Sequence, residues 1–274
     1  RDSTLTGGFT GGVWNYVFTG VTGAPPDHCG NPVWNGKHHM PSGTASTNVP
    51  QTPVIAEKPF LTVDSTGKFS LRIPTVRHGT AGHDFDTNPP AVGFESVYVT
   101  QPSDSAAAIN AKLAQGLHVV VSPGVYHLDA PLELNHPNQV LLGLGYATLV
   151  SAKQNAVIRV GDVDGVRVAG FLLQAGPPQG DQMAPALLQW GVSGKYAGSA
   201  SNPGFIHDVF GRVGGPDGTY SSPVATELML HIRSGHVVGD NMWLWRADHE
   251  KRGRAVYDSR NPVKNGIVVN GDNV

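Results

Sequence analysis

The sequence reads S-G-H-V-V-G-D-N-M-W-L-W-R-A-D-H from Ser234 to His249 and K-N-G-I-V-V-N-G-D-N-V from Lys264 to Val274. Each stretch has a dipeptide typical of turns, a short run of β-branched residues and a Gly-Asp step. This pattern predicts that one structural unit occurs twice. The matching parts are Ser234-Gly235 with Asn265-Gly266, Val237-Val238 with Ile267-Val269, and Gly239-Asp240 with Gly271-Asp272.

The same plan recurs upstream, clearly at residues 138–145 and 164–173 and more weakly at 207–213. Glycines interrupt these apolar runs at intervals of about 27 to 41 residues, the range of stacked repeats with loops of variable length. β-Strand units with this imperfect period predict a parallel β-solenoid, in which inward Val, Leu and Ile side chains stack from coil to coil. The glycines are Gly143, Gly170, Gly211, Gly239 and Gly271.

The composition limits the classes of function. The chain has 274 residues, enough for one large or two modest domains. Only 15% of the residues are charged, and 19 basic side chains stand against 21 acidic ones. This balance argues against a nucleic-acid binder, which needs clustered Lys and Arg. We also expect no membrane span, because no apolar run approaches the length of about 20 residues that a bilayer requires.

Two features bear on the cellular compartment. The chain begins at Arg1 without Met, which fits a processed, secreted protein, although an expressed fragment would look the same. Cys29 is the only cysteine, so no disulfide can form within the chain. We expect a secreted protein with an inert thiol, and pairing of Cys29 with a segment outside this chain stays open.

Residues 1–100 differ from residues 101–274, and we expect them to form an N-terminal, loop-rich β cap region. Its clearest element is a predicted hairpin over residues 60–73, with a turn at 65–67. Histidines are dense here, but their spacings match no frame of metal ligands, so we expect no metal. The residues concerned are His28, His38, His39, His78 and His83, with Asp84 and Asp86.

A short helix is predicted at the start of the second region. Ser103 and Asp104 are suited to cap a helix over residues 105–115, in which Ile109 and Leu113 share one face. Without a cover, the first coil of a solenoid would expose its apolar end. We therefore expect this helix to cap the solenoid.

Several of these segments together resemble the pectate-lyase superfamily. The branch that they resemble most holds glycoside hydrolase family 55 and phage tailspikes, together with large secreted microbial proteins related to those hydrolases. The resemblance covers about residues 10–274 and implies an all-β, right-handed parallel β-helix and a carbohydrate substrate. It rests on D-S-A-A-A-I-N-A-K-L-A-Q-G at 104–116, V-V-V-S-P-G-V-Y-H-L at 119–128, V-L-L-G-L-G-Y-A-T-L-V at 140–150, V-D-G-V-R-V-A-G at 163–170 and W-L-W-R-A-D-H at 243–249.

Members of this group continue well beyond the position that corresponds to Val274, which falls inside a predicted coil. We therefore expect a further segment, or a second polypeptide, to complete the β-helix. Catalytic residues carried on later coils would then lie outside these 274 residues.

Asp240, Asp248 and Asp272 are the candidate catalytic residues. Glycoside hydrolysis normally uses two carboxyl groups on either side of the scissile bond, one of them kept protonated. Asp240 and Asp272 occupy matching Gly-Asp steps, so we expect stacking to bring them close together. The alternative is that each aspartate only ends a strand as a turn residue.

Trp243, Trp245, Arg246 and His249 are the candidate substrate-binding residues. The two tryptophans alternate with Met242 and Leu244, so both indoles point to one side of a strand. If that side faces outward they form a platform for sugar rings, and if it faces inward they belong to the core. Arg246 and Asp248 share the other side and could pair, and His249 could carry a proton, although adjacent residues of a strand point apart.

Three classes of function remain. We favour a secreted glycoside hydrolase on a neutral polymer such as β-1,3-glucan, which the resemblance implies and the low charge suits, with no cofactor. A polysaccharide lyase would use Arg246, Arg252 or Arg254 and a bound Ca²⁺. Gly161-Asp-Val-Asp-Gly165 resembles part of a calcium loop, but Leu173 stands where the last ligand is required, so a turn fits better. The third class is a non-catalytic glycan-binding solenoid of the adhesin or tailspike kind.

Overall fold

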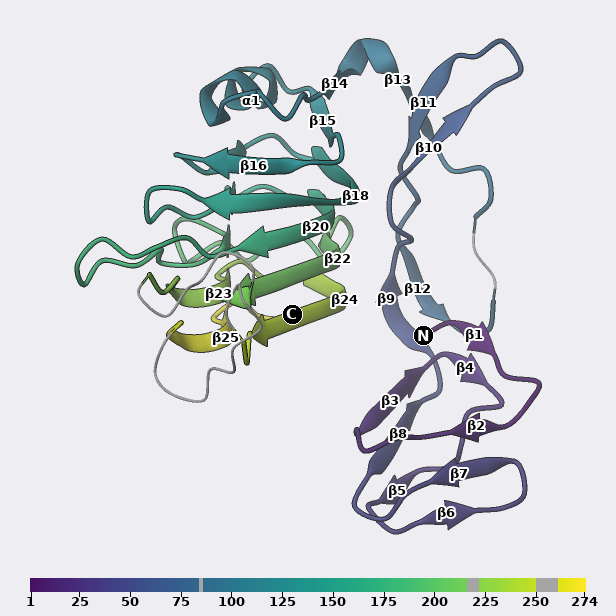
Figure 1. Ribbon diagram of the computed structural model, residues 1–274. Coiled ribbons are helices and arrows are strands. Elements are labelled where there is room, and N and C mark those ends of the chain that lie inside the picture. The colour runs from purple at the N-terminus through teal and green to yellow at the C-terminus, as the bar shows by residue number, and fades with distance from the viewer. Residues whose placement is uncertain (84–85, 216–221, 250–260) are drawn as a thin grey trace. The chain divides into compact units, whose positions relative to one another are not determined.

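The computed structural model describes residues 1–83, 86–215, 222–249 and 261–274 (Figure 1). Its contacts divide the chain into two compact units, one of Arg1–Glu57 with Pro74–Pro90 and one of Lys58–Ile73 with Ala91–Val274. This division differs from a boundary near residue 100, because the segment 58–73 and residues 91–100 belong to the second unit. No helix among the described residues is long and apolar enough to cross a membrane.

The first unit consists of short strands in four small sheets, ordered β1-β4, β3-β8-β5, β2-β7-β6 and β12-β9. Phe9 packs edge to face on Tyr16 and Phe18, with ring centroids 5.1 and 5.2 Å apart. These three rings therefore join the β2-β7-β6 sheet to the β3-β8-β5 sheet. The strands are β1 (Ser3–Thr4), β2 (Phe9–Thr10), β3 (Tyr16–Thr19), β4 (Val21–Thr22), β5 (His28–Cys29), β6 (Val33–Trp34), β7 (His38–Met40), β8 (Ala45–Val49), β9 (Thr52–Ile55) and β12 (Arg77–Thr80).

The predicted hairpin is confirmed. β10 (Phe60–Val63) pairs antiparallel with β11 (Phe69–Arg72), which also pairs with β13 (Ala91–Gly93). Leu71 is fully buried in an apolar cluster that includes Val120 of the second unit. This packing explains why the hairpin belongs to the second unit.

Two parallel sheets dominate the second unit, so the chain is mostly β. The first sheet has the order β14-β15-β18-β20-β22-β24, with β16 beside β18, and the second has the order β17-β19-β21-β23-β25. The first contains β14 (Val97–Val99), β15 (His118–Val121), β16 (Val125–Leu128), β18 (Val140–Ser151), β20 (Arg167–Gln174), β22 (Gly204–Val213) and β24 (Val237–Arg246). The second contains β17 (Leu132–Leu134), β19 (Ile158–Val160), β21 (Leu188–Trp190), β23 (Thr226–Ile232) and β25 (Val263–Val269).

Columns of aliphatic side chains form the core between these sheets. Leu141, Val168 and Ile206 are paired in register on β18, β20 and β22, and all three are fully buried in one cluster. The second sheet supplies an equivalent column that includes Leu188 and Leu230. Each such side chain contributes about 1.5–3 kcal/mol on burial, so the core depends on correct register.

A short helix lies between β14 and β15, near the start of the second region as predicted, but it begins later than expected. α1 (Ala106–Leu113) follows Ser105, whose hydroxyl accepts a hydrogen bond from the amide of the third helical residue at 3.2 Å. Ser103 and Asp104 do not cap it. The Asp104 carboxylate accepts hydrogen bonds from the Tyr98 hydroxyl and the Gln101 amide, both at 2.8 Å, and so closes the preceding turn.

Residues with positive φ interrupt the long strands of the first sheet at one register position. They are Gly170 in β20, Asp208 in β22 and Asn241 in β24, which lie opposite one another. Earlier in the sheet the corresponding strand is divided, because β15 pairs with one half of β18 and β16 with the other. The backbone therefore changes direction at this column.

The glycines that suggested the repeat do not form one column. Gly143 and Gly170 do approach each other, but Gly211 pairs with Leu244 and Gly239 with Ile206. Their spacing reflected strands with inserted loops of different length, and a loop of unknown length conceals which residues stack. The repeat of strands was predicted correctly, and the equivalence of the glycines was wrong.

Replacing Gly170 by Ala is expected to destabilise the second unit by at least about 2 kcal/mol. Gly170 has a φ of +78°, and a Cβ at this position would lie 2.4 Å from the carbonyl oxygen of Gly143. Gly266→Ala is the matched control, because its Cβ would meet only the Leu244 side chain, at ordinary contact distances of 3.6 and 3.8 Å. Urea unfolding followed by circular dichroism measures both, and equal midpoints for the two variants would contradict this account of the column.

Candidate functional site

The two candidate tryptophans of β24 lie on the outer side of the first sheet. Trp243 is 59% exposed, whereas Met242 and Leu244, which alternate with it, pack against the core. The indoles of Trp243 and Trp245 are stacked, with centroids 5.7 Å apart and planes inclined by 27°. Of the two orientations that the sequence left open, the structure shows the outward one.

Three further rings extend this pair into an aromatic row. Phe210 of β22 meets Trp243 edge to face at 6.1 Å, Tyr146 of β18 stacks on Phe210 at 5.1 Å, and His249 lies 5.4 Å from Trp245. The sequence analysis missed Phe210 and Tyr146. Phe210 is in register with Trp243, a relation that becomes visible only when the loop between the strands is placed.

A small hollow of about 100 Å³ lies along the aromatic row. Its lining is mainly apolar, and the guanidinium of Arg212 is its charged group. Arg212 Nε donates a hydrogen bond to Oε1 of the fully buried Gln174, so this group is held in place. Apolar rings beside a fixed polar group suit a ligand with both C–H and O–H groups. The lining residues are Leu172, Phe210, Gly211, Arg212, Trp243 and Trp245.

Asp248 and His249 form a hydrogen-bonded pair just beyond β24, with His249 Nδ1 3.0 Å from Asp248 Oδ1. The expectation that these neighbours point apart was wrong, because the strand and its alternation end at Arg246. The hydrogen bond from His249 lowers the pKa of Asp248 below its usual range. Asp248 is therefore held in its ionised form.

Asp240 lies in the first half of β24, in register with His207 of β22. Beside it, Asn241 donates a hydrogen bond to Asp208 Oδ1 and Lys58 donates one to Asp208 Oδ2, both at 2.5 Å. Burial opposes ionisation of Asp208, but these two hydrogen bonds outweigh it and lower the pKa. Asp208, which the sequence did not single out, thus ties the segment that leads into the hairpin to two strands.

The predicted equivalence of Asp240 and Asp272 is wrong. Asp272 follows β25 in the second sheet, whereas Asp240 lies in the first sheet. The backbone carbonyl of Asp272 accepts a hydrogen bond from the His236 amide at 2.9 Å, and its side chain is exposed. Register makes Gly271-Asp272 the counterpart of Ser234-Gly235 in the preceding coil. Similar turn dipeptides at different corners of the coil caused the error.

The residues considered for a lyase or for a calcium loop do not lie together in one part of the structure. Arg246 ends β24 and is partly buried. Arg252 and Arg254 lie outside the described residues. In the loop 161–165, the Asp162 carboxylate accepts hydrogen bonds from the amides of Val192 and Ser193, at 2.9 and 3.1 Å. Asp162 therefore links neighbouring coils through protein groups.

The histidine-rich N-terminal region was considered for a metal site. Within residues 1–83, 86–215, 222–249 and 261–274, no three or more His, Cys, Asp or Glu side chains are placed to hold a metal ion. His38 Nδ1 accepts a hydrogen bond from the Phe9 amide at 3.2 Å, and His83 Nδ1 lies 3.1 Å from Thr4 Oγ1. Asp84, which was considered with these histidines, lies outside the described residues.

The site offers a binding surface more plainly than a pair of catalytic carboxyls. A general acid for glycoside hydrolysis needs a raised pKa, and the lowered pKa of Asp248 suits a base or a stabilising anion instead. Burial does raise the pKa of Glu133, against the opposing charge of Arg159. However, Glu133 lies on β17 in the second sheet, 2.8 Å from Arg159 Nη1.

Replacing His249 by Ala is expected to raise the pKa of Asp248 toward the ordinary value of about 3.9, because the hydrogen bond that favours the carboxylate is lost. Carbon-13 NMR of the side-chain carboxyl, followed as a function of pH, measures this shift. His236→Ala is the control, since it removes an imidazole elsewhere. If the Asp248 midpoint is the same with and without His249, the hydrogen bond between them does not form in solution.

Comparison with known proteins places this geometry in a family. A family model described as the LAM55 pectate lyase-like domain matches residues 97–274. An exo-beta-1,3-glucanase of Streptomyces sp. (strain SirexAA-E / ActE) is 36% identical over 277 residues, which cover 100% of this chain and 42% of that protein.

Two solved structures of a Streptomyces protein are similar to this chain. The structure of sacteLam55A from Streptomyces sp. SirexAA-E has a TM-score of 0.82 at 35% identity, and that of a variant in complex with glucose has 0.84 at 36%. Each alignment covers 100% of this chain and 46% of that one, so the chain spans less than half the length of these relatives. Because the family model matches well over half of its residues, the chain belongs to the LAM55 pectate lyase-like domain family.

Proposed function

We propose that the chain is part of a glycoside hydrolase that acts on β-1,3-glucan. The observation that carries this proposal is its 36% identity, over the whole chain, to an exo-beta-1,3-glucanase. The low charge supports it, because a formal net charge of −2 suits a neutral polymer better than a polyuronate. We further propose that the protein is secreted, as a polymer-degrading enzyme must reach its substrate, and that it needs no cofactor.

We infer that the two parallel sheets are the faces of a right-handed parallel β-helix. Each coil supplies two strand segments to the first sheet, separated by the column of Gly170, Asp208 and Asn241, and one segment to the second. A second column of positive φ, which includes Asn138, Gly165 and His236, precedes the first sheet. Such corners allow three short strands to close a coil, and parallel crossover connections are right-handed in nearly all proteins.

The ends of this β-helix support the rest of the fold proposal. Ile109 and Leu113 of α1 are fully buried in the same core as Val119, which suits a helix that covers the first coil. On the last coil, Ile267 and Val269 extend the inward columns of the second sheet but are 40% and 44% exposed. We propose that a further coil covers them, supplied by additional chain or by a second polypeptide. The first unit would serve as the N-terminal cap region.

The aromatic row is the proposed substrate-binding surface. Glucose units present apolar C–H faces and hydroxyl edges, which match the exposed indole of Trp243 and the fixed guanidinium of Arg212. Among the candidate acids, Asp248 is the best placed, because its partner His249 belongs to the row. Asp240 and Asp272 remain candidates that single substitutions by Asn will test.

Incubation of laminarin with the purified protein, together with any polypeptide that co-purifies with it, is expected to release reducing sugar without the ultraviolet absorbance of unsaturated uronates. Pectate and alginate in parallel serve as controls, because a lyase would give that absorbance with one of them. Absorbance from either polymer would overturn the hydrolase proposal. Retention by laminarin without release of sugar, by the protein together with any co-purifying polypeptide, would limit its role to binding.

Trp243→Ala is expected to weaken laminarin binding by roughly tenfold, since a large exposed aromatic surface is lost from the row. Trp34→Ala is the matched control, because Trp34 is 74% exposed on β6 of the first unit. Affinity electrophoresis in gels with and without laminarin compares the two variants. Equal retardation of both would remove the aromatic row as the binding surface.

A further inference from the structure

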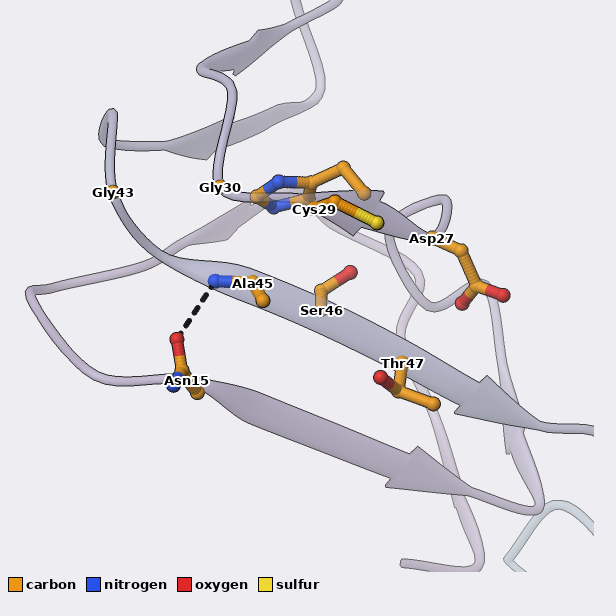
Figure 2. Close-up of a pocket in the computed structure, with 9 residues that line it drawn as sticks. Asn15, Asp27, Cys29, Gly30, Gly43, Ala45, Ser46 and Thr47 are labelled. Carbon is orange, nitrogen blue, oxygen red and sulfur yellow. Dashed lines mark hydrogen bonds between the residues drawn. The ribbon is translucent and has the colours of Figure 1, made fainter.

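The first unit contains a pocket that the proposed glucan site does not use. It has a volume of about 500 Å³ and lies over the β3-β8-β5 sheet (Figure 2). Asn15, which precedes β3, lies on one side of β8, and Asp27 and Cys29 lie on the other, on or beside β5. Thr47 of β8 and the Cys29 thiol are both exposed, so the pocket opens to solvent.

Several polar groups of this pocket can form further hydrogen bonds. Asp27 Oδ1 accepts hydrogen bonds from the backbone and side chain of Asn48, at 2.5 and 2.8 Å, which leaves Oδ2 available. Asn15 Oδ1 accepts from the Ala45 amide at 2.9 Å, which leaves the side-chain NH₂ to donate. Both ring nitrogens of His28 are buried without a hydrogen-bond partner among the described residues. Buried polar atoms without a protein partner are uncommon in folded proteins.

The charge of the lining restricts what can bind. Asp27 is its carboxylate, and no Lys or Arg is among the residues that line the pocket. An anionic ligand would therefore meet a like charge with no cation to balance it. Val17, which is 67% exposed, is in register with the lining residue Thr47 on the neighbouring strand and presents an apolar side chain beside it.

We propose that this pocket binds a neutral sugar unit. The Asp27 carboxylate would accept from sugar hydroxyls, Asn15 and Thr47 would donate to them, and Val17 would contact a C–H face. The arrangement is that of a small-molecule site, in which a few fixed polar groups stand among apolar ones. The choice of glucose as the sugar rests on the proposed function, whereas the site itself rests on the geometry of the first unit.

Cys29 allows a direct test, because it is the only cysteine of the chain and its exposed thiol lines the pocket. Glucose and laminaritriose are expected to slow alkylation of Cys29 by iodoacetamide in a saturable manner, as measured by mass spectrometry of the intact chain. Galacturonic acid at the same concentrations is expected to leave the rate unchanged. Alkylation that neutral sugars do not slow, up to their solubility limit, would overturn the proposal.

Two variants test whether a sugar that protects Cys29 from alkylation is bound in this pocket. Thr47→Val removes one hydroxyl and keeps the shape of a β-branched strand residue, so the fold is retained. It is expected to raise the sugar concentration for half-protection roughly three- to tenfold. Thr10→Val, on the exposed side of β2 in the other sheet, is the matched control and is expected to have no effect. Equal protection in both variants would place the sugar elsewhere and refute the site.

The outcome is independent of catalysis. Protection of Cys29 in a protein that, together with any co-purifying polypeptide, does not hydrolyse laminarin would retain the pocket and reject the hydrolase proposal. Hydrolysis of laminarin without protection would do the reverse.

Discussion

The structure depends on the register of its parallel strands. Leu141, Val168 and Ile206 stack inward only when β18, β20 and β22 are aligned residue for residue, and a shift by one residue would turn each of them outward. The same alignment places Gly170, Asp208 and Asn241 at one corner, where the backbone can turn. Register therefore fixes the core, the corners and the outer surface together.

The strands were predictable because their signals are local. Turn dipeptides and β-branched runs identified the segments that became β20, β22 and β24, and the apolar pattern around the turn near Gly67 identified the β10-β11 hairpin. Their partners were not predictable, since loops of different length separate successive coils. The Gly-Asp steps at 239–240 and 271–272 therefore looked equivalent, although the first lies within a strand of the first sheet and the second follows a strand of the second sheet.

The candidate site shows the same division. Alternation along one strand predicted that Trp243 and Trp245 share a side, and the structure places that side outward. Phe210 and Tyr146 join them from other coils, and only register brings those rings together. Parallel strands in register thus bring together residues that lie far apart in sequence, and a single-sequence analysis recovers only the part of the row that lies on one strand.

The electrostatics of the row constrain any mechanism built on it. His249 holds Asp248 as a carboxylate, so Asp248 can accept a proton or stabilise positive charge but cannot donate a proton near neutral pH. Hydrolysis of a glycosidic bond also requires a protonated acid on the leaving-group side. If Asp248 takes part, the acid must be another group, held where burial or a neighbouring anion raises its pKa. A catalytic centre that uses this row would therefore combine the ionised Asp248 carboxylate, just beyond β24, with a second carboxyl group whose surroundings keep it protonated.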